Sequence, residues 1–312
     1  MLRSKISNEH KQKVLELEND FILLQILPEI GAKIHSILHK PRNTKWLWQN
    51  HQNRLQILPL GSNYDDNWTG GWEELFPNDT ACEFQGRQLP DHGELWSQPW
   101  QWELNKESRA CIEVHLWRHC ICVPAVVEKR ILLEKRKSKF IIKYSITNLS
   151  EEAINFLWKL HPAIAISPDH QLLLPGGKII PVDLTFSSII GSPGPFEWPI
   201  VIDKQGRNHD LSTILPKESG HKEFVYVTDL PEGWCTIKNK RNGGEFRLSF
   251  PTEVFPYLWL FITYGGWRDL YTIVLEPCTN FPKDLDSAYK NGTCGRIEGQ
   301  SRLECEITVS LQ

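Results

Sequence analysis

Apolar side chains at every second position are the feature that most limits how this chain can fold. Between residues 139 and 146, Phe140, Ile142 and Tyr144 alternate with neighbours that are mostly polar. The same period occurs in residues 302–311, near the end of the chain. Successive side chains of a strand point to opposite faces of a sheet, so this period predicts half-buried β-strands.

Short strand-like runs fill most of the remaining sequence, and turn residues separate them. Helical patterns are rare, and we expect only short helices near residues 71–75 and 282–289. Many short strands between Gly, Pro and Asn turns favour an all-β sandwich or barrel over a parallel α/β sheet. The further strands are expected at 21–27, 33–38, 110–116, 125–134, 153–160, 223–229, 234–239, 245–250, 257–264 and 270–276.

The domain organisation is predicted to be simple. No stretch has the composition of a linker, so we expect residues 1–312 to form a single domain. The best loop candidate is the Pro- and Gly-rich segment 191–199, and strand patterning resumes after it. Hydrophobic residues make up 40% of the chain, which is sufficient for a sizeable core.

Charge and targeting signals exclude several functional classes. The formal net charge is −3, so no basic excess is present to neutralise phosphates, and we expect no nucleic-acid partner. The N-terminal segment lacks the apolar stretch of a signal peptide, and no run of about eighteen apolar residues occurs. We therefore expect a cytoplasmic protein without membrane contact, whose 8 cysteines are free thiols.

Tryptophan is unusually frequent, with 13 residues against a single methionine. A Trp ring offers a flat apolar face and one N–H donor, which suits the C–H faces and hydroxyls of a sugar. The alternative is that these rings fill the core of a large sandwich, and we expect this of most of them. The composition therefore favours a small-molecule sugar as ligand.

Two histidines and one glutamate stand where side chains tend to point into clefts. His161 follows the run NFLWKL and precedes Pro162, and Glu276 ends an apolar run before Pro277. We expect each Pro to stop its strand. A histidine titrates near working pH, and a partly desolvated Glu gains base strength, so the two could form an acid–base pair. His92 lies in an Asp-His-Gly turn. Any of the three alone is more often structural.

Two further segments are predicted to line a pocket. Residues 70–78 (GGWEELFPN) combine glycines, aromatic rings and acids, and residues 257–267 form an aromatic run beside Glu276. Simple packing of the aromatic rings explains both segments as well. The residues that we expect to line the site are Trp72, Glu74, Trp259, Tyr264 and Trp267.

Metal and nucleotide signals are weak. His115, His119, Cys120 and Cys122 are of types that bind zinc, but neighbouring strand positions face opposite sides of a sheet. We therefore expect no metal site. The sequence also lacks GxSxG, GxGxxG, Walker and HExxH motifs.

The order of five short motifs resembles the galactose mutarotase-like superfamily, which includes aldose 1-epimerases and hexose-phosphate mutarotases. The motifs are LPEIGAKIHSI, GGWEELFPN, DHGELW, a strand-end HP and LEP. Each motif is short, but their order and wide spacing extend from about residue 17 to residue 311. The resemblance implies a large antiparallel β-sandwich of the super-sandwich type.

The resemblance also implies a role for each polar residue. His161 would be the general acid that protonates the ring oxygen, and Glu276 the general base that takes the proton of the anomeric hydroxyl. His92 would hold a sugar hydroxyl, and Asp229 is a candidate for the acid that grips two further hydroxyls. A carboxylate and a protonated imidazole suffice for ring opening and closure at neutral pH, so no cofactor is implied.

Several positions depart from the sugar epimerases. Lys159 and Leu160 precede His161 where Asn is usual, Pro162 follows it, and Cys278 replaces a usual Gln. The sugar therefore stays open, as does the choice between monomer and homodimer. Two other functions remain as alternatives: a non-catalytic sugar-binding protein, and a carbohydrate-cleaving enzyme, which would need two carboxylates.

Overall fold

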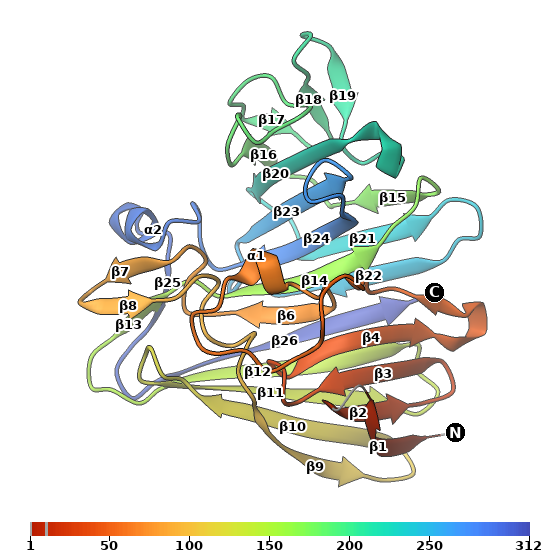
Figure 1. Ribbon diagram of the computed structural model, residues 1–312, viewed down its shortest axis with the longest axis vertical. Helices are drawn as coiled ribbons and strands as arrows, with labels where there is room; N and C mark the ends of the chain where they lie inside the picture. The colour runs from red at the N-terminus through yellow and green to blue at the C-terminus, as the bar shows by residue number, and fades with distance from the viewer. Residues whose placement is uncertain (1, 10–11) are drawn as a thin grey trace.

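The computed structural model describes residues 2–9 and 12–312 and contains two large sheets of antiparallel strands (Figure 1). In the twelve-stranded sheet, β5 (Thr44–Lys45) pairs with β4 beside the main path. That path runs in the order β1 (Arg3–Glu9), β2 (Gln12–Glu18), β3 (Ile22–Leu27), β4 (Lys33–His39), β6 (Trp72–Leu75), β14 (Lys159–Ala165), β24 (Tyr271–Cys278), β23 (Tyr257–Tyr264), β20 (His221–Thr228), β16 (Lys178–Pro181) and β17 (Phe196–Glu197).

The eight-stranded sheet runs in the order β15 (His170–Leu173), β21 (Trp234–Asn239), β22 (Glu245–Ser249), β26 (Arg302–Leu311), β12 (Lys139–Asn148), β11 (Ala125–Glu134), β10 (Cys111–His119) and β9 (Gln101–Glu107). Small elements complete the described chain: the pairs β7 (Cys82–Phe84) with β8 (Arg87–Leu89), β13 (Ile154–Phe156) with β25 (Gly295–Ile297) and β18 (Ile200–Ile202) with β19 (Asn208–Asp210), the helices α1 (Tyr64–Asn67) and α2 (Leu285–Asn291), and the 3₁₀ turns η1 (Lys40–Arg42) and η2 (Lys217–Ser219).

One hydrophobic core lies between the two sheets. Leu24 and Ile34 of the larger sheet belong to the same buried cluster as Ile131 and Val309 of the smaller one. The period-two strands behave as expected, because buried and exposed residues alternate along β12. The prediction of an all-β antiparallel sandwich is therefore confirmed.

Two local predictions differ from the structure, and a third is correct apart from its bounds. Residues 72–75 form strand β6 rather than a helix, and all four are buried, so no alternation was visible in the sequence. The run expected at 153–160 is divided between β13 and β14. The helix expected near 282–289 is present as α2, which begins after the N-cap Asp284.

Neither of the two strand-ending prolines ends its strand. β14 continues through Pro162 to Ala165, and β24 continues through Pro277 to Cys278. The ladder between β14 and β24 pairs Lys159 and Ala163 with their partners but no residue between them. Pro162, which has no backbone N–H, lies in this interruption and is tolerated there.

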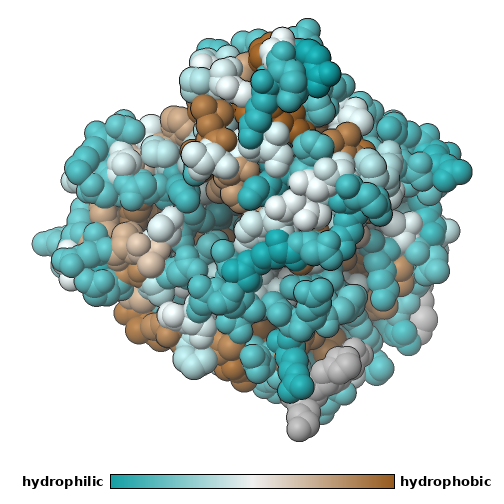
Figure 2. All heavy atoms as spheres, turned by 45° about the horizontal axis from the view of Figure 1, so that its top comes forward, coloured by the Kyte–Doolittle hydropathy of each residue, from teal (hydrophilic) through white to brown (hydrophobic). Residues whose placement is uncertain are grey.

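The face of the large sheet that points away from the core carries a second set of buried groups. Ala163 of β14 and Val274 of β24 belong to a separate small cluster with Tyr64 and Trp68. Figure 1 shows α1 in front of β6 and β14, in the middle of this face. Figure 2 shows brown, apolar surface gathered beneath the projecting β18–β19 region.

Candidate active site

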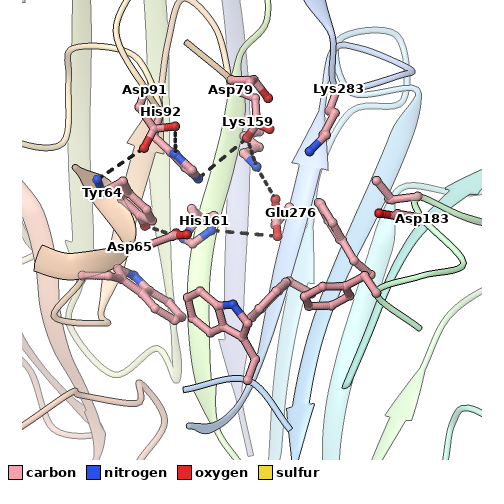
Figure 3. Close-up of a pocket in the computed structure, with 17 residues that line it drawn as sticks. Tyr64, Asp65, Asp79, Asp91, His92, Lys159, His161, Asp183, Glu276 and Lys283 are labelled. Atoms are coloured by element: carbon pink, nitrogen blue, oxygen red, sulfur yellow. Dashed lines mark hydrogen bonds and ion pairs between the residues drawn. The ribbon is translucent and has the colours of Figure 1, made fainter. Parts of the chain in front are cut away.

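A cavity of about 320 Å³ lies on this face of the large sheet. Its floor is formed by strands β14, β24, β23 and β20, and its walls by α1 and the loops around residues 79–92 and 182–186 (Figure 3). The volume is within the range of about 300–1,000 Å³ that is typical of small-molecule sites. One part of the lining is polar and charged, and another is aromatic.

His161 and Glu276 form the centre of the polar part, on the adjacent strands β14 and β24. The Nε2 atom of His161 lies 3.9 Å from Oε1 of Glu276, and both side chains are buried. Lys159 lies two residues before His161 and therefore points to the same face. The structure thus brings together the two residues that the sequence suggested as an acid–base pair.

Lys159 links two carboxylates in the lining of the cavity. Its Nζ atom lies 2.6 Å from Oδ1 of Asp79 and 2.6 Å from Oε2 of Glu276. The same ammonium group lies 4.7 Å from the centre of the Trp259 ring, at cation–π distance. Burial alone would lower the pKa of Lys159, but the two carboxylates outweigh it and raise the pKa above its ordinary value. The two carboxylates therefore favour the charged form of Lys159.

Burial moves both His161 and Glu276 towards their neutral forms. It lowers the pKa of His161 well below the ordinary value, and the cations of Lys159 and Lys33 add to the effect. Burial raises the pKa of Glu276, although Lys159 opposes the rise. We expected a protonated imidazole at neutral pH. Burial instead favours a neutral His161, because it lowers the pKa of the imidazole.

Tyr64 of α1 contacts both histidines of the cavity. Its hydroxyl group donates a hydrogen bond of 2.5 Å to Oε2 of Glu73 and lies 3.1 Å from Nδ1 of His161. Its ring stacks on the His92 ring with centroids 4.0 Å apart. Lys33 is paired with the other oxygen of Glu73 at 2.5 Å. Sequence reasoning missed Tyr64, because no local motif surrounds it.

His92 lines the cavity, in the turn that the sequence predicted. Its backbone adopts a φ of 57°, in the left-handed region. The Nδ1 atom lies 2.9 Å from Oδ1 of Asp91, and Nε2 lies 4.0 Å from Oδ1 of Asp79. The carboxylates and the stacked Tyr64 ring hold the imidazole in one orientation.

Aromatic rings form the apolar part of the lining. Trp267 lies edge-on to Phe261, with ring centroids 5.2 Å apart, and Phe224 and Phe186 lie beside Phe261. Trp68 continues this wall towards His161, with centroids 5.6 Å apart. Of the aromatic residues that the sequence suggested, Trp267 is the one that lines the cavity.

Four of the suggested ligand-binding residues are buried away from the cavity surface. In β6, Glu73 pairs with His161 and shares its face, whereas Trp72 and Glu74 point into the core. Phe261 of β23 points into the cavity, and Tyr264 lies three positions further along the same strand. Tyr264 therefore points to the opposite face, into the core. Trp259 is on the cavity side but fully covered, beneath Lys159.

Asp229 lies elsewhere on the surface. Its side chain is 63% exposed and pairs with Lys178 at 2.9 Å. Besides Glu276, the acids that line the cavity are Asp65, Asp79, Asp91 and Asp183. We therefore replace Asp229 by these residues as candidates for binding sugar hydroxyls.

The described residues contain neither a metal-binding cluster nor a helix that could span a membrane. Within residues 2–9 and 12–312, no three His, Cys, Asp or Glu side chains are grouped in a way that could hold a metal ion. No helix in that part of the chain has the length and apolar character needed to span a membrane.

Comparison with known proteins identifies the fold. No family model and no curated protein sequence matches the chain. Among solved structures, a galactose mutarotase-like protein from Clostridium acetobutylicum aligns with a TM-score of 0.71 and 11% identity over 100% of this chain and 98% of that one. A candidate aldose 1-epimerase from Klebsiella pneumoniae aligns with a TM-score of 0.72 and 13% identity, over 99% of this chain and 83% of that one. A galactose mutarotase related enzyme from Lactobacillus acidophilus aligns with a TM-score of 0.65 and 13% identity, over 96% of this chain and 97% of that one.

The chain therefore has the galactose mutarotase-like fold that its motifs suggested. At identities of 11–13% these likenesses concern the fold, so the activity must be argued from the site.

Proposed function

We propose that this protein is a mutarotase that interconverts the α and β anomers of an aldose by acid–base ring opening. The observation that carries the proposal is the 3.9 Å separation of His161 Nε2 and Glu276 Oε1 at the floor of an aromatic-lined cavity. Anomer exchange needs one group at the ring oxygen and another at the anomeric hydroxyl, and these two oxygens are bonded to the same carbon. His161 Nε2 and Glu276 Oε1 are close enough together to reach both of these sugar oxygens.

The proton balance of the reaction fits the pair. Opening the ring moves one proton from the anomeric hydroxyl to the enzyme and one from the enzyme to the ring oxygen. After rotation about the C1–C2 bond, closure reverses both transfers. His161 and Glu276 must therefore share one proton at the start, on either residue. A neutral His161 beside a protonated Glu276 has the same proton count as the ion pair, and burial favours this neutral form.

The pair predicts a bell-shaped dependence of rate on pH. At low pH both groups are protonated and no base remains, and at high pH both are deprotonated and no acid remains. The two limbs belong to the coupled pair rather than to one residue. The remaining polar lining would hold the sugar: His92 and the acids around it accept or donate hydrogen bonds, and Trp267 offers an apolar face.

The remaining parts of the proposal follow the sequence. We propose a single domain that acts in the cytoplasm on a small-molecule sugar, as a monomer or homodimer, without a cofactor. The absence of a basic excess in the chain gives no support for a nucleic-acid partner.

The test is the rate of anomer exchange over a panel of aldoses, measured by NMR exchange spectroscopy. We expect acceleration by the wild type and a loss of about 10²–10⁴-fold in Glu276→Gln, because Gln keeps the shape but cannot take a proton. Glu306→Gln on the exposed face of β26 is the matched control and should keep full activity. An unchanged rate in Glu276→Gln would remove Glu276 from the mechanism. Sugar binding without acceleration by the wild type would indicate a binding protein, and release of a smaller sugar from a glycan would indicate a cleaving enzyme.

A further inference from the structure

A buried chain of polar groups extends from His161 away from the cavity. It comprises His161, Tyr64, Glu73, Lys33 and Thr69, joined in that order by hydrogen bonds or ion pairs. Each of these five residues is at most 7% exposed. Groups buried in this way are held in place by their partners, so the direction of each hydrogen bond can be worked out.

The direction is fixed at the phenol of Tyr64. A phenol has one proton to donate, and it has two neighbours here: Oε2 of Glu73 at 2.5 Å and Nδ1 of His161 at 3.1 Å. Glu73 is held as an acceptor, because Lys33 donates to its other oxygen from 2.5 Å. The phenol proton therefore points at Glu73, and short bonds of this kind to a carboxylate are the stronger ones.

The phenol oxygen must then accept a hydrogen bond from His161. A neutral imidazole carries one N–H and one lone pair, and the hydrogen bond at one nitrogen decides which tautomer is present. With Nδ1–H donated to Tyr64, the lone pair is on Nε2, which is the nitrogen on the side of Glu276 and the cavity. Figure 3 shows the imidazole between Tyr64 on one side and Glu276 on the other.

We propose that Tyr64, backed by Glu73 and Lys33, is a positioning residue that holds His161 in the Nδ1–H tautomer. This inference rests on the proposed mutarotase function for its meaning, because it keeps Nε2 free to accept and return the proton of the sugar. The alternative tautomer has a hydrogen on Nε2 and cannot accept a proton there. The protein thus needs Nδ1–H whichever of the two residues holds the shared proton.

The ring of Tyr64 contacts His92, the second histidine of the cavity. It stacks on His92 with an interplanar angle of 8°. Tyr64→Phe removes the hydroxyl group and keeps this stacking, so it separates the two contributions. Glu73 belongs to no part of the cavity lining, and its substitution changes no direct contact with a sugar in the cavity.

The first test is the tautomer of His161 in the protein without sugar, read from ¹⁵N chemical shifts after selective histidine labelling. In the wild type we expect the pattern of Nδ1–H at neutral pH. A wild type with Nε2–H overturns the inference at once, whatever its activity. This readout needs no turnover, so it is separate from the failure of the proposed function, which appears as absent acceleration in the wild type.

Glu73→Gln makes a sharper test because it should reverse the hydrogen bonds. The Gln oxygen must face the Lys33 ammonium, which leaves its NH₂ group to donate to the Tyr64 phenol. The phenol proton then turns to Nδ1 of His161 and forces the Nε2–H tautomer. We expect that pattern in the NMR spectrum and a fall in kcat of about 10²-fold or more with little change in KM.

Tyr64→Phe covers the case in which Glu73→Gln fails to fold. Without the hydroxyl acceptor we expect the Nδ1–H population of His161 to fall, while the ¹⁵N signals of His92 stay in place. If His161 keeps Nδ1–H in both variants, Tyr64 does not set the tautomer and the inference is wrong. A change of tautomer in either variant without any change in kcat would equally overturn the positioning role.

Discussion

Lys159 shows how a single residue can set the proton affinity of the candidate site. Its ammonium group contacts Glu276 and Asp79. Lys159 opposes the rise in the pKa of Glu276 that burial causes, whereas the carboxylate of Asp79 adds to that rise. The two residues should therefore have opposite effects when they are replaced.

We predict that Lys159→Met raises the pKa of Glu276, because a nearby cation that favours its charged form is lost. A neighbouring cation at this distance typically lowers the pKa of a carboxyl group by about one to three units. Both limbs of the pH–rate profile should move to higher pH, since the pair then binds protons more readily. The pKa can be measured by ¹³C NMR titration of the Glu276 carboxyl group, which requires no turnover.

The companion variant is Asp79→Asn, which removes a negative charge and should move the same pKa and both limbs to lower pH. The other charged or polar groups that face His161 and Glu276 are His92, Tyr64 and Lys33, and both variants retain them. Shifts of the same sign in the two variants would contradict the electrostatic account and indicate a common structural change. Circular dichroism before the titration would show whether each variant is folded.

At the scale of strands, period-two patterning located most of the sandwich. β12 and β11 have the bounds expected or nearly so, because each has one face in the core and one face that is partly exposed. β21 and β23 also have the expected bounds, although most of their residues are buried. β6 was mistaken for a helix because its residues are covered on both sides. The error also affected the predicted site. The alternation within β6 places Glu73 on the same face as His161, whereas the sequence analysis had named Glu74.

The site itself could be predicted only where a residue carries its own local signal. His161, Glu276 and His92 stand beside Pro or Gly in short motifs, and the structure brings all three to one cavity. Tyr64 and Asp79 came without such a signal, because their roles arise from contacts with residues far along the chain. Trp259 and Tyr264 lay in the expected aromatic run, but strand alternation and the Lys159 side chain keep them from the surface.

The two sheets are joined by a buried ionic contact for which we predict a large effect on stability. Lys129 of β11 pairs with Glu74 of β6 at 2.7 Å, and Tyr144 of β12 donates to the same carboxylate at 2.5 Å. Lys129→Met leaves Glu74 buried without its cation, which should lower the free energy of unfolding by about 3–5 kcal/mol. Urea denaturation measures this change.

Lys143→Met is the matched control for that prediction. Lys143 lies on the neighbouring strand, and its partner Glu306 is 3.9 Å away with both side chains about half exposed. Because solvent screens such exposed pairs, each contributes about 0–1 kcal/mol to the free energy of unfolding. Equal effects of the two substitutions would show that the buried contact between the sheets contributes no more than a surface pair.

At the scale of the whole molecule, the site depends on segments from most of the sequence. Tyr64 comes from a short helix near the start, His161 from a central strand and Glu276 from a strand near the end. These segments keep their relative positions because β14, β24 and β23 are neighbours in the same sheet, with the shared core beneath them.

This dependence predicts that the chain unfolds as one cooperative unit. The main buried cluster includes residues of both sheets and of the region around β18, such as Val201, so loss of one part exposes the others. With reductant present for the free cysteines, tryptophan fluorescence and far-UV circular dichroism should give coincident urea transitions. Lys129→Met should move both transitions to the same lower urea concentration, because its contact joins the two sheets. Two separate transitions, of which Lys129→Met moves only one, would show instead that the chain consists of units that fold independently.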